Sequence, residues 1–508
     1  MADSTQFILL RVLLALTAGA IAPLALAPFD YWYLSAISVA LLFFTLQGCT
    51  PKASGWLGWC YGLGFFGVGI SWVFVSIHEH GNAPTLLAGS LTGLFVAAMA
   101  ILMVIQCWLY RRLFYNVLGF IALWLLFEWL RSWLLTGFPW LYLGYALLDT
   151  PLAQYAPFGG VWLLSLYVVL SGTLLITIIK RWQHPLQAFA MIAIIIIPWF
   201  AAEKGKIPTD LTREQGDEVS VMMVQANIPQ QLKWQRSELD GIMQKYVDLS
   251  QDSGKVDLLI WPETAIPTFY RNASTMLSPL MEYLQQNNTG MISGIPSVYP
   301  DPTKPRNIGY HNSLSVFAGG SGSYHKQRLV PFGEYVPLEQ QLRGLIDFFN
   351  LPMSNFSLGP ENQPPLEVNG LKIAPYICYE IAYPELVRQS SLTSDLLLTV
   401  SNDTWFGHSI APAQHLQIAR MRALETGRWL IRSTNNGISA LISPRGEITS
   451  TIPQFEQAVL IGNVKRMEGL TPYQQYGVKP LQVAVVVMLF FALITRPRAN
   501  RRRTYQTS

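Results

Sequence analysis

The fold is decided by the stretch LKIAPYICYE, residues 371–380. Its apolar, β-prone run stops at Cys378, and Tyr379 and Glu380 follow. When a strand ends in a nucleophile at a sharp turn, the nucleophilic side chain is held at the edge of the sheet. A helix N-terminus just beyond it would offer N–H donors that favour a thiolate and an oxyanion. Taken alone, the same letters also describe a half-buried cysteine on a strand, which is common for a free thiol.

The chain as a whole is too apolar for an ordinary soluble enzyme. Its 508 residues are 51% hydrophobic and only 13% charged, with a mean hydropathy of +0.28. Membrane spans are therefore expected. The net charge of +4 is small and no basic block lies in a folded region, so we expect no nucleic-acid partner. Only Cys378 lies outside the apolar segments, which makes a disulfide framework implausible.

Apolar segments of membrane-crossing length fill the N-terminal part of the chain. The candidates are residues 7–27, 31–49, 56–77, 84–110, 114–135, 160–180 and 185–202. Each is close to the ~20 residues that cross a bilayer. A last run, residues 480–495, is short for a span. We therefore predict a transmembrane helical bundle over residues 1–202, a water-facing domain over 203–479, and a last transmembrane helix with a basic tail over 480–508.

The basic residues predict which way the domain faces. With the N-terminus in the cytoplasm, the positive side chains of the cytoplasmic connections are Lys52, Arg111, Arg112, Lys180 and Arg181, followed by the arginine-rich tail. Cytoplasmic connections carry the excess of lysine and arginine, so residues 203–479 face outward. Residues 25–27, Ala-Leu-Ala, could instead end a cleaved leader. Positive charge before that run is sparse, and we favour a retained span.

Strand-like and helix-like runs alternate through the outward domain. The strand-like runs are residues 219–224, 258–261, 291–295, 313–317, 324–327, 396–400, 429–433 and 438–442. The helix-like runs are residues 237–250, 275–286 and 411–426. Such alternation indicates a layered α/β architecture.

Three short motifs end strands of this domain in groups that can do chemistry. Residues 260–263, Ile-Trp-Pro-Glu, put a carboxylate at one strand tip. Lys326 closes a second strand and leads through a proline and glycine loop to Glu334, and Cys378 closes a third. A solvated acid or a surface lysine is the ordinary interpretation of each motif alone. Together they supply a thiol, a base and a cation, which acyl transfer requires.

The order and spacing of WPE at 261–263, HKxxLVPFGE at 325–334 and ICYE at 377–380 resemble the carbon–nitrogen hydrolase (nitrilase) superfamily. With several spans before them and one after, the chain resembles the apolipoprotein N-acyltransferase family of Gram-negative bacteria over nearly its whole length. Further matching motifs are TGFPW at 136–140, LKW at 232–234, SNDTWFG at 401–407 and STNNGISA at 433–440. The resemblance implies an integral membrane α-helical bundle of about eight spans joined to an α/β nitrilase-like αββα sandwich domain.

The resemblance also implies roles for particular side chains. Glu263 is expected to be the general base, Cys378 the nucleophile and Lys326 the oxyanion cation, with Glu334 as a supporting acid. Trp234, Tyr379 and Glu380 match positions that the family needs for activity, and Asn312 and Trp405 are further candidates for the site. No cofactor and no metal is implied. The pair His78 and His80 lacks the spacing and the third ligand of a metal site.

The implied reaction is a ping-pong acyl transfer. The thiol takes a fatty acyl group from a phospholipid, and the N-terminal amine of a diacylglyceryl-cysteine apolipoprotein accepts it. The implied location is the bacterial inner membrane, with the catalytic domain in the periplasm, and the implied state is a monomer. Two alternatives stay open: a membrane-tethered amidase or nitrilase acting on a small substrate, and a transporter with a binding domain.

Several hydrophobic patterns allow less specific interpretations. The loops at residues 137–140 and 348–356 either line the substrate entrance or anchor the domain at the membrane surface. GLGFFG at 62–67 matches a dinucleotide fingerprint but lies inside an apolar span, so we expect close helix packing instead. Glu128 and Arg131 are expected to pair with each other inside the bundle.

Overall fold

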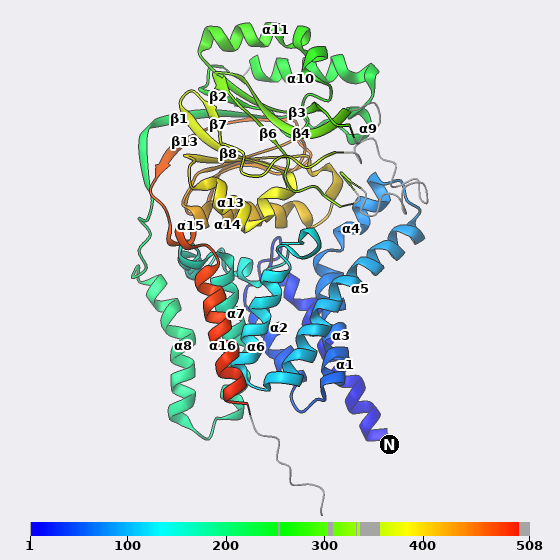
Figure 1. Cartoon of the computed structure of the whole chain (residues 1–508), viewed down its shortest axis with the longest axis vertical. Coiled ribbons are helices and arrows are strands. Elements are labelled where there is room, and N and C mark those ends of the chain that lie inside the picture. Colours follow the sequence, from blue (N-terminus) through cyan, green and yellow to red (C-terminus); the bar gives the residue numbers. More distant parts are fainter. Residues whose placement is uncertain (1, 252–253, 303–307, 332, 336–355, 497–508) are drawn as a thin grey trace, which may run out of the picture.

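The computed structural model describes residues 2–251, 254–302, 308–331, 333–335 and 356–496. Figure 1 shows a set of roughly parallel apolar helices below an α/β domain, with α13 (Pro384–Ser391) and α14 (Ala411–Thr426) between the sheets and those helices. The C-terminal helix, red in the figure, returns to the helical part after the α/β domain has been completed. This is the arrangement that the sequence predicts.

The helical part has a helix at every predicted span, and the span at 56–77 is divided between two of them, α3 (Pro51–Gly69) and α4 (Trp72–Val75). Its other main helices are α1 (Ala2–Ile21), α2 (Tyr33–Thr45), α5 (Thr85–Leu109), α6 (Val117–Leu130), α7 (Ala156–Lys180), α8 (Pro185–Glu203) and α16 (Lys479–Ile494). Within the described part of the chain, four helices are long and apolar enough to cross a membrane, and the bent pair α3 and α4 would make a fifth. The helices α2, α6 and α16 are shorter. The number of eight spans therefore stays a prediction.

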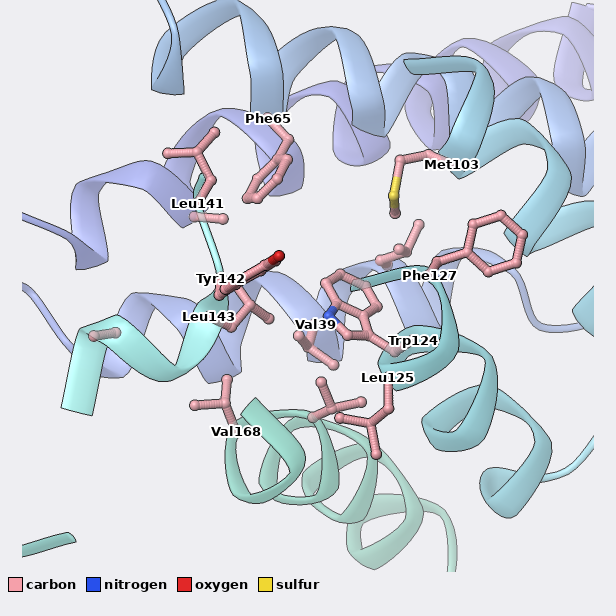
Figure 2. Packing of buried hydrophobic residues seen from close by; sticks show 14 of the residues in the cluster. Val39, Phe65, Met103, Trp124, Leu125, Phe127, Leu141, Tyr142, Leu143 and Val168 are labelled. Atoms are coloured by element: carbon pink, nitrogen blue, oxygen red, sulfur yellow. The ribbon is translucent and has the colours of Figure 1, made fainter. Parts of the chain in front are cut away.

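Small residues and one ion pair hold this bundle together. A methyl group at Gly58 or Gly62 would collide with α5, so these glycines let α3 and α5 approach closely, as predicted. Glu128 and Arg131 are buried and lie 4.0 Å apart, which confirms their pairing. Figure 2 shows side chains from several helices, Trp124 of α6 among them, converging on a common apolar core.

The α/β domain contains two sheets. The first has the order β13-β1-β2-β3-β4-β6 and the second the order β12-β11-β10-β9-β8-β7-β5. The strands of the first sheet are β1 (Arg213–Gln225), β2 (Leu258–Ile260), β3 (Gly290–Pro300), β4 (Ile308–Ala318), β6 (Ser323–His325) and β13 (Ala458–Glu468). Those of the second are β5 (Gly320–Ser321), β7 (Leu366–Val368), β8 (Leu371–Ile377), β9 (Leu396–Ser401), β10 (Leu430–Thr434), β11 (Ser439–Ile442) and β12 (Ile448–Ile452).

Three apolar cores separate four layers. One core lies between the sheets and joins residues such as Ile260 and Ile377. A second packs α10 (Leu239–Gln251) and α11 (Tyr270–Asn287) on the first sheet, and a third packs α13 and α14 on the second. The remaining helices are short, α9 (Gln230–Lys233) and α15 (Pro472–Tyr476). The result is the predicted αββα sandwich.

The strand directions bring the three predicted motifs to one edge. In the first sheet β2 runs parallel to β1 and β3, and in the second β8 runs parallel to β9 and β10. Because the carboxyl ends of parallel strands meet at one edge, the residues that follow β2 and β8 can face a common space.

The sequence pattern does not predict β12 or β13. Both have irregular, partly exposed burial patterns, and β13 is identified only by its pairing with β1.

Helix α14 fastens the α/β domain to the helical part. Its Gln414 accepts a hydrogen bond from the Trp140 indole at 2.7 Å, and Gln417 accepts one from the backbone of Ala27 at 3.1 Å. Glu425 accepts the Val161 N–H at 2.6 Å, near the N-terminal end of α7. These polar contacts recur at helical spacing, so one face of α14 belongs to the interface with the bundle.

Candidate active site

Cys378 stands at a sharp turn directly after β8. Its φ of 55° lies in the left-handed region, which is costly for a residue with a side chain and is found at strained functional turns. The turn continues as a short 3-10 helix, Cys378–Ala382, and α13 begins only at Pro384. The predicted helix N-terminus therefore lies at the thiol, but it belongs to a short 3-10 helix and not to an α-helix. The 3-10 turn forms there because Glu380 caps it, accepting the Ile377 N–H at 2.8 Å.

Glu263, Lys326, Glu334 and Asn312 form a compact group that we call the acid–lysine cluster. The Lys326 ammonium donates to the Glu334 carboxylate at 2.9 Å and lies 3.7 Å from Glu263 Oε1. Asn312 Nδ2 donates to both carboxylates, at 2.8 Å to Glu263 and 3.0 Å to Glu334. All four side chains are buried. The two predicted acids and the predicted lysine thus meet, and Asn312 bridges the acids.

Backbone N–H groups also donate hydrogen bonds to the carboxylates of Glu263 and Glu334. The Asn402 N–H donates to Glu263 Oε2 at 2.8 Å, and the Val330 N–H donates to Glu334 Oε2 at 2.9 Å. Glu334 thus carries the closer ammonium contact. Glu263 has only the longer contact with the Lys326 ammonium, at 3.7 Å, and keeps a lone pair that can accept a proton from another donor.

The electrostatics keep the thiol neutral and the lysine charged. Burial raises the pKa of Cys378 far above its usual range, and the Glu263 carboxylate adds to that effect more than Lys326 opposes it. Burial alone would lower the pKa of Lys326, but the carboxylates of Glu334 and Glu263 outweigh burial and raise it. The raised pKa of Cys378 therefore favours a neutral thiol over a preformed thiolate.

Glu380 lies beneath the turn and has no contact free for substrate. It is fully buried, and its oxygens accept the N–H groups of Ile377, Gln327 and Arg328 as well as the Tyr324 hydroxyl. Burial raises its pKa to about 7. Glu380 therefore ties the backbone behind Lys326 to the backbone before Cys378. It positions two groups of the site and does not face a ligand.

Tyr379 and Trp405 face the helical part. Tyr379 stacks on Trp140 with ring centroids 6.3 Å apart, and its hydroxyl donates to the Gly137 carbonyl at 3.3 Å. The Trp405 carbonyl accepts a hydrogen bond from Ser76 at 2.7 Å. Trp140 is buried, so the loop at 137–140 supports the nucleophile turn instead of lining an entrance or anchoring the domain. Of the loop at 348–356, only Phe356 lies within the described residues.

A second buried charged group, which we call the paired cluster, consists of Asp403, His415, Arg432 and Ser401. The Arg432 guanidinium donates to Asp403 at 2.6 Å, and the Ser401 hydroxyl donates to the same carboxylate. His415 Nε2 lies 3.1 Å from the Cys378 carbonyl oxygen. A carbonyl can only accept, so Nε2 carries a hydrogen in either charge state.

The paired cluster sets the tautomer of its histidine. Burial, and then the Arg432 charge, lowers the pKa of His415, which favours the neutral ring. Arg432 Nη2 lies 3.2 Å from His415 Nδ1 and can donate to it, leaving the proton on Nε2. The ring therefore holds the Cys378 carbonyl and fixes the left-handed turn. Trp140 packs on the same ring, with centroids 5.8 Å apart.

Trp234 lies in a cavity beside the acid–lysine cluster. The cavity has a volume of about 810 Å³, and its lining residues include Lys233, Trp234, Arg236, Asn272, Tyr310 and Phe356. The Lys233 ammonium is buried and donates to the backbone carbonyl of Glu263 at 2.9 Å. Burial lowers its pKa to about 8, against the effect of Glu263. The cavity thus adjoins the site through one lysine.

Sequence reasoning did not single out Lys233, Asn402 or His415. Lys233 and Asn402 fall within LKW and SNDTWFG, which resemble family motifs but carry no role by themselves. His415 lies on a strongly predicted helix with no motif around it, and its contact with Cys378 spans distant segments. Its role becomes visible only in three dimensions.

The chain matches two family models. Residues 18–174 match the apolipoprotein N-acyltransferase N-terminal domain, and residues 220–471 match carbon-nitrogen hydrolase. An apolipoprotein N-acyltransferase of Azotobacter vinelandii is 47% identical over 96% of this chain and 96% of that protein. That of Pseudomonas aeruginosa strain LESB58 is 47% identical over 97% of this chain and 98% of its own. Among solved structures, an amidase variant of the nitrilase superfamily from Nesterenkonia is 17% identical, with a TM-score of 0.36, over 53% of this chain and 97% of that one.

Proposed function

The chain belongs to the apolipoprotein N-acyltransferase family, and we propose that it transfers its acyl group through a thioester on Cys378, with Glu263 as base and Lys326 as oxyanion cation. It is a multi-pass membrane N-acyltransferase that acylates lipoproteins. The observation that carries the proposal is the acid–lysine cluster, in which the Lys326 ammonium lies 3.7 Å from Glu263, together with the left-handed turn that holds Cys378 directly after β8.

In the first step the Cys378 sulfur attacks the ester carbonyl of a phospholipid. A carbon–sulfur bond forms, and the thiol proton passes to Glu263. The negative charge that develops on the carbonyl oxygen faces the Lys326 ammonium, and the Tyr379 N–H is a second candidate donor. When the ester carbon–oxygen bond breaks, Glu263 returns the proton to the glycerol oxygen. Lysophospholipid leaves, and the acyl thioester remains.

In the second step the N-terminal amine of a diacylglyceryl-cysteine lipoprotein attacks the thioester. A carbon–nitrogen bond forms and the carbon–sulfur bond breaks. The excess amine proton passes through Glu263 to the Cys378 sulfur, which restores the thiol. Glu334 contributes by holding Lys326 in place, at 2.9 Å. The same residues thus serve both steps, in reversed order.

A membrane enzyme suits these substrates energetically. Moving a sixteen-carbon chain from lipid into water would cost on the order of 12 kcal/mol at roughly 0.8 kcal/mol per CH₂. A site beside the bilayer lets the tails stay in lipid.

We further propose a bundle over residues 1–202, a catalytic domain over 203–479 that faces the periplasm, and a terminal helix and tail over 480–508. We also propose location in the inner membrane and action as a monomer.

Mass spectrometry tests the thioester directly. The intact protein, purified in detergent, is incubated with a labelled phospholipid and digested. We expect an acyl adduct on the peptide that contains Cys378, its loss on addition of a diacylglyceryl peptide, and no adduct in Cys378→Ala. An intact, folded protein that releases free fatty acid without forming the adduct would contradict the proposal and favour a hydrolase.

A further inference from the structure

We propose that the cavity beside the acid–lysine cluster binds the phosphate group of the donor phospholipid, with Lys233 as its central cation. This inference rests on the proposed function, because it requires a phospholipid as acyl donor. It adds a subsite that selects the donor and that the second substrate, which has no phosphate next to its reacting group, does not need.

The first support is a buried cation that no carboxylate among the described residues contacts. Lys233 is 3% exposed and forms no ion pair within 4.0 Å with a described residue, although the more distant Glu263 charge acts on it. Its ammonium has three protons, and the Glu263 carbonyl takes one of them, at 2.9 Å. A buried charge without a contacting counter-charge is costly. An anion in the cavity would relieve that cost and occupy the remaining protons.

The second support is the hydrogen-bonding character of the lining. The Trp234 indole N–H is buried and has no acceptor among the described residues. The guanidinium of Arg236 adds a further donor, and the amides of Gln235 and Asn272 each have one N–H left after donating to Gln231 and Thr268. No carboxylate belongs to the described lining. Phosphate oxygens only accept, so the set of donors matches a phosphate. It does not match an ammonium group or a bare hydrocarbon tail.

The third support is the order of the layers. The cavity is bounded by α9, by the start of α11 and by β3 and β4 of the first sheet. Cys378 follows the second sheet, and α14 lies between that sheet and the bundle. Figure 1 shows the same order, with α9 farther from the bundle than β8. A lipid whose tails lie in the bilayer and whose ester reaches Cys378 would therefore point its headgroup at the cavity.

The test compares acyl donors that share a chain but differ in phosphate. Formation of the Cys378 thioester is timed in the full-length protein with dipalmitoyl phosphatidylethanolamine, dipalmitoyl phosphatidylglycerol and the phosphate-free 4-nitrophenyl palmitate. For Lys233→Met we expect a loss of about 10- to 100-fold with both phospholipids, the usual range for a lost charged hydrogen bond. The loss with 4-nitrophenyl palmitate should be less than about twofold.

Two variants serve as matched controls. Lys233→Arg keeps the charge and should retain most of the phospholipid rate. Lys255→Met removes an exposed lysine from the other end of β2 and should leave all three rates unchanged. Equal losses of Lys233→Met with every donor would overturn the proposal, because Lys233 would then act only through Glu263. A defect confined to transfer from thioester to acceptor peptide would also overturn it and assign the cavity to the peptide. Absence of any adduct in the unmodified protein would instead refute the thioester itself.

Discussion

Two buried charged clusters flank Cys378, and they differ in how completely their charges are balanced. The acid–lysine cluster sets two carboxylates against one ammonium, and Glu263 lies 3.7 Å from that ammonium. In the paired cluster Asp403 accepts hydrogen bonds from Arg432 at 2.6 Å and from the Ser401 hydroxyl. Burial opposes ionisation of Asp403, but interactions led by the Arg432 charge outweigh it and hold the pKa of Asp403 below its usual range. The first cluster can exchange a proton, whereas the second cannot readily do so.

The contrast separates chemistry from positioning within one site. A side chain that must accept a proton needs free hydrogen-bonding capacity, as Glu263 has. A side chain that must hold a strained turn needs all of its capacity used, as Asp403 and Glu380 do. Substitutions in the acid–lysine cluster should therefore reduce rates more than stability. Substitutions in the paired cluster should do the reverse.

The largest effect should come from replacing Glu263. We expect Glu263→Gln to slow thioester formation about 10³-fold, because general base catalysis typically contributes 10²–10⁴. Its thermal unfolding midpoint should stay near that of the unmodified protein, since Lys326 keeps Glu334 as a partner. Asp403→Asn, the matched change in the other cluster, leaves Arg432 unpaired and should cost roughly 3–5 kcal/mol of stability. Equal stability losses in the two variants would abolish the contrast.

The next effect concerns the cation. Lys326→Met removes the charge that faces the oxyanion, so we expect a loss of about 10²–10³-fold in the rate of thioester formation. Single-turnover measurements with phospholipid report it. In Lys326→Met the carboxylates of Glu263 and Glu334 would face each other without a cation between them, which should destabilise the fold. The double variant Lys326→Met, Glu334→Gln removes one of these charges. It should therefore be more stable than Lys326→Met but form the thioester equally slowly. A normal rate in Lys326→Met would remove Lys326 from the chemistry.

A smaller effect should follow from loosening the turn. We expect His415→Leu to reduce the maximal rate of thioester formation about 10- to 100-fold, since it removes the donor that holds the Cys378 carbonyl. His415→Gln can place an amide N–H near the position of Nε2 and should recover part of that rate. The KM for phospholipid should change little in either variant. No recovery by glutamine, despite normal folding, would show that the ring does more than position the turn.

The smallest effect is a dependence on pH. Burial lowers the pKa of Lys233 to about 8, so the side chain is charged below that pH and neutral above it. Glu263 is the ionisable group that faces it, through its carbonyl and its charge. If the charge binds phosphate, kcat/KM for phospholipid should fall several-fold between about pH 7 and 9. Neither 4-nitrophenyl palmitate nor the Lys233→Met variant should show this fall.

The sequence predicts the catalytic half of this comparison better than the positioning half. Glu263 and Cys378 each follow an apolar run and Lys326 follows a short strand, so local pattern and strand direction predict that they lie at one edge. The roles of His415 and Trp140 depend on packing between segments that are far apart in the chain. The same holds for β13, whose letters alternate poorly and whose place is fixed by β1. Local periodicity carries no information about such partners.

The polar row on α14 has a consequence for how the protein is made. The bundle helices α1 to α8 leave the ribosome before α14 does, and N-terminal parts generally fold first. Gln414, Gln417 and Glu425 accept hydrogen bonds from Trp140, Ala27 and Val161, all of which precede α8 in the chain. The inserted bundle is thus in place before the helical layer of the α/β domain that packs against it, and it can guide the folding of that layer. A shortened chain that begins after α8 would contain both charged clusters and Cys378 but would lack the hydrogen-bond partners of this layer.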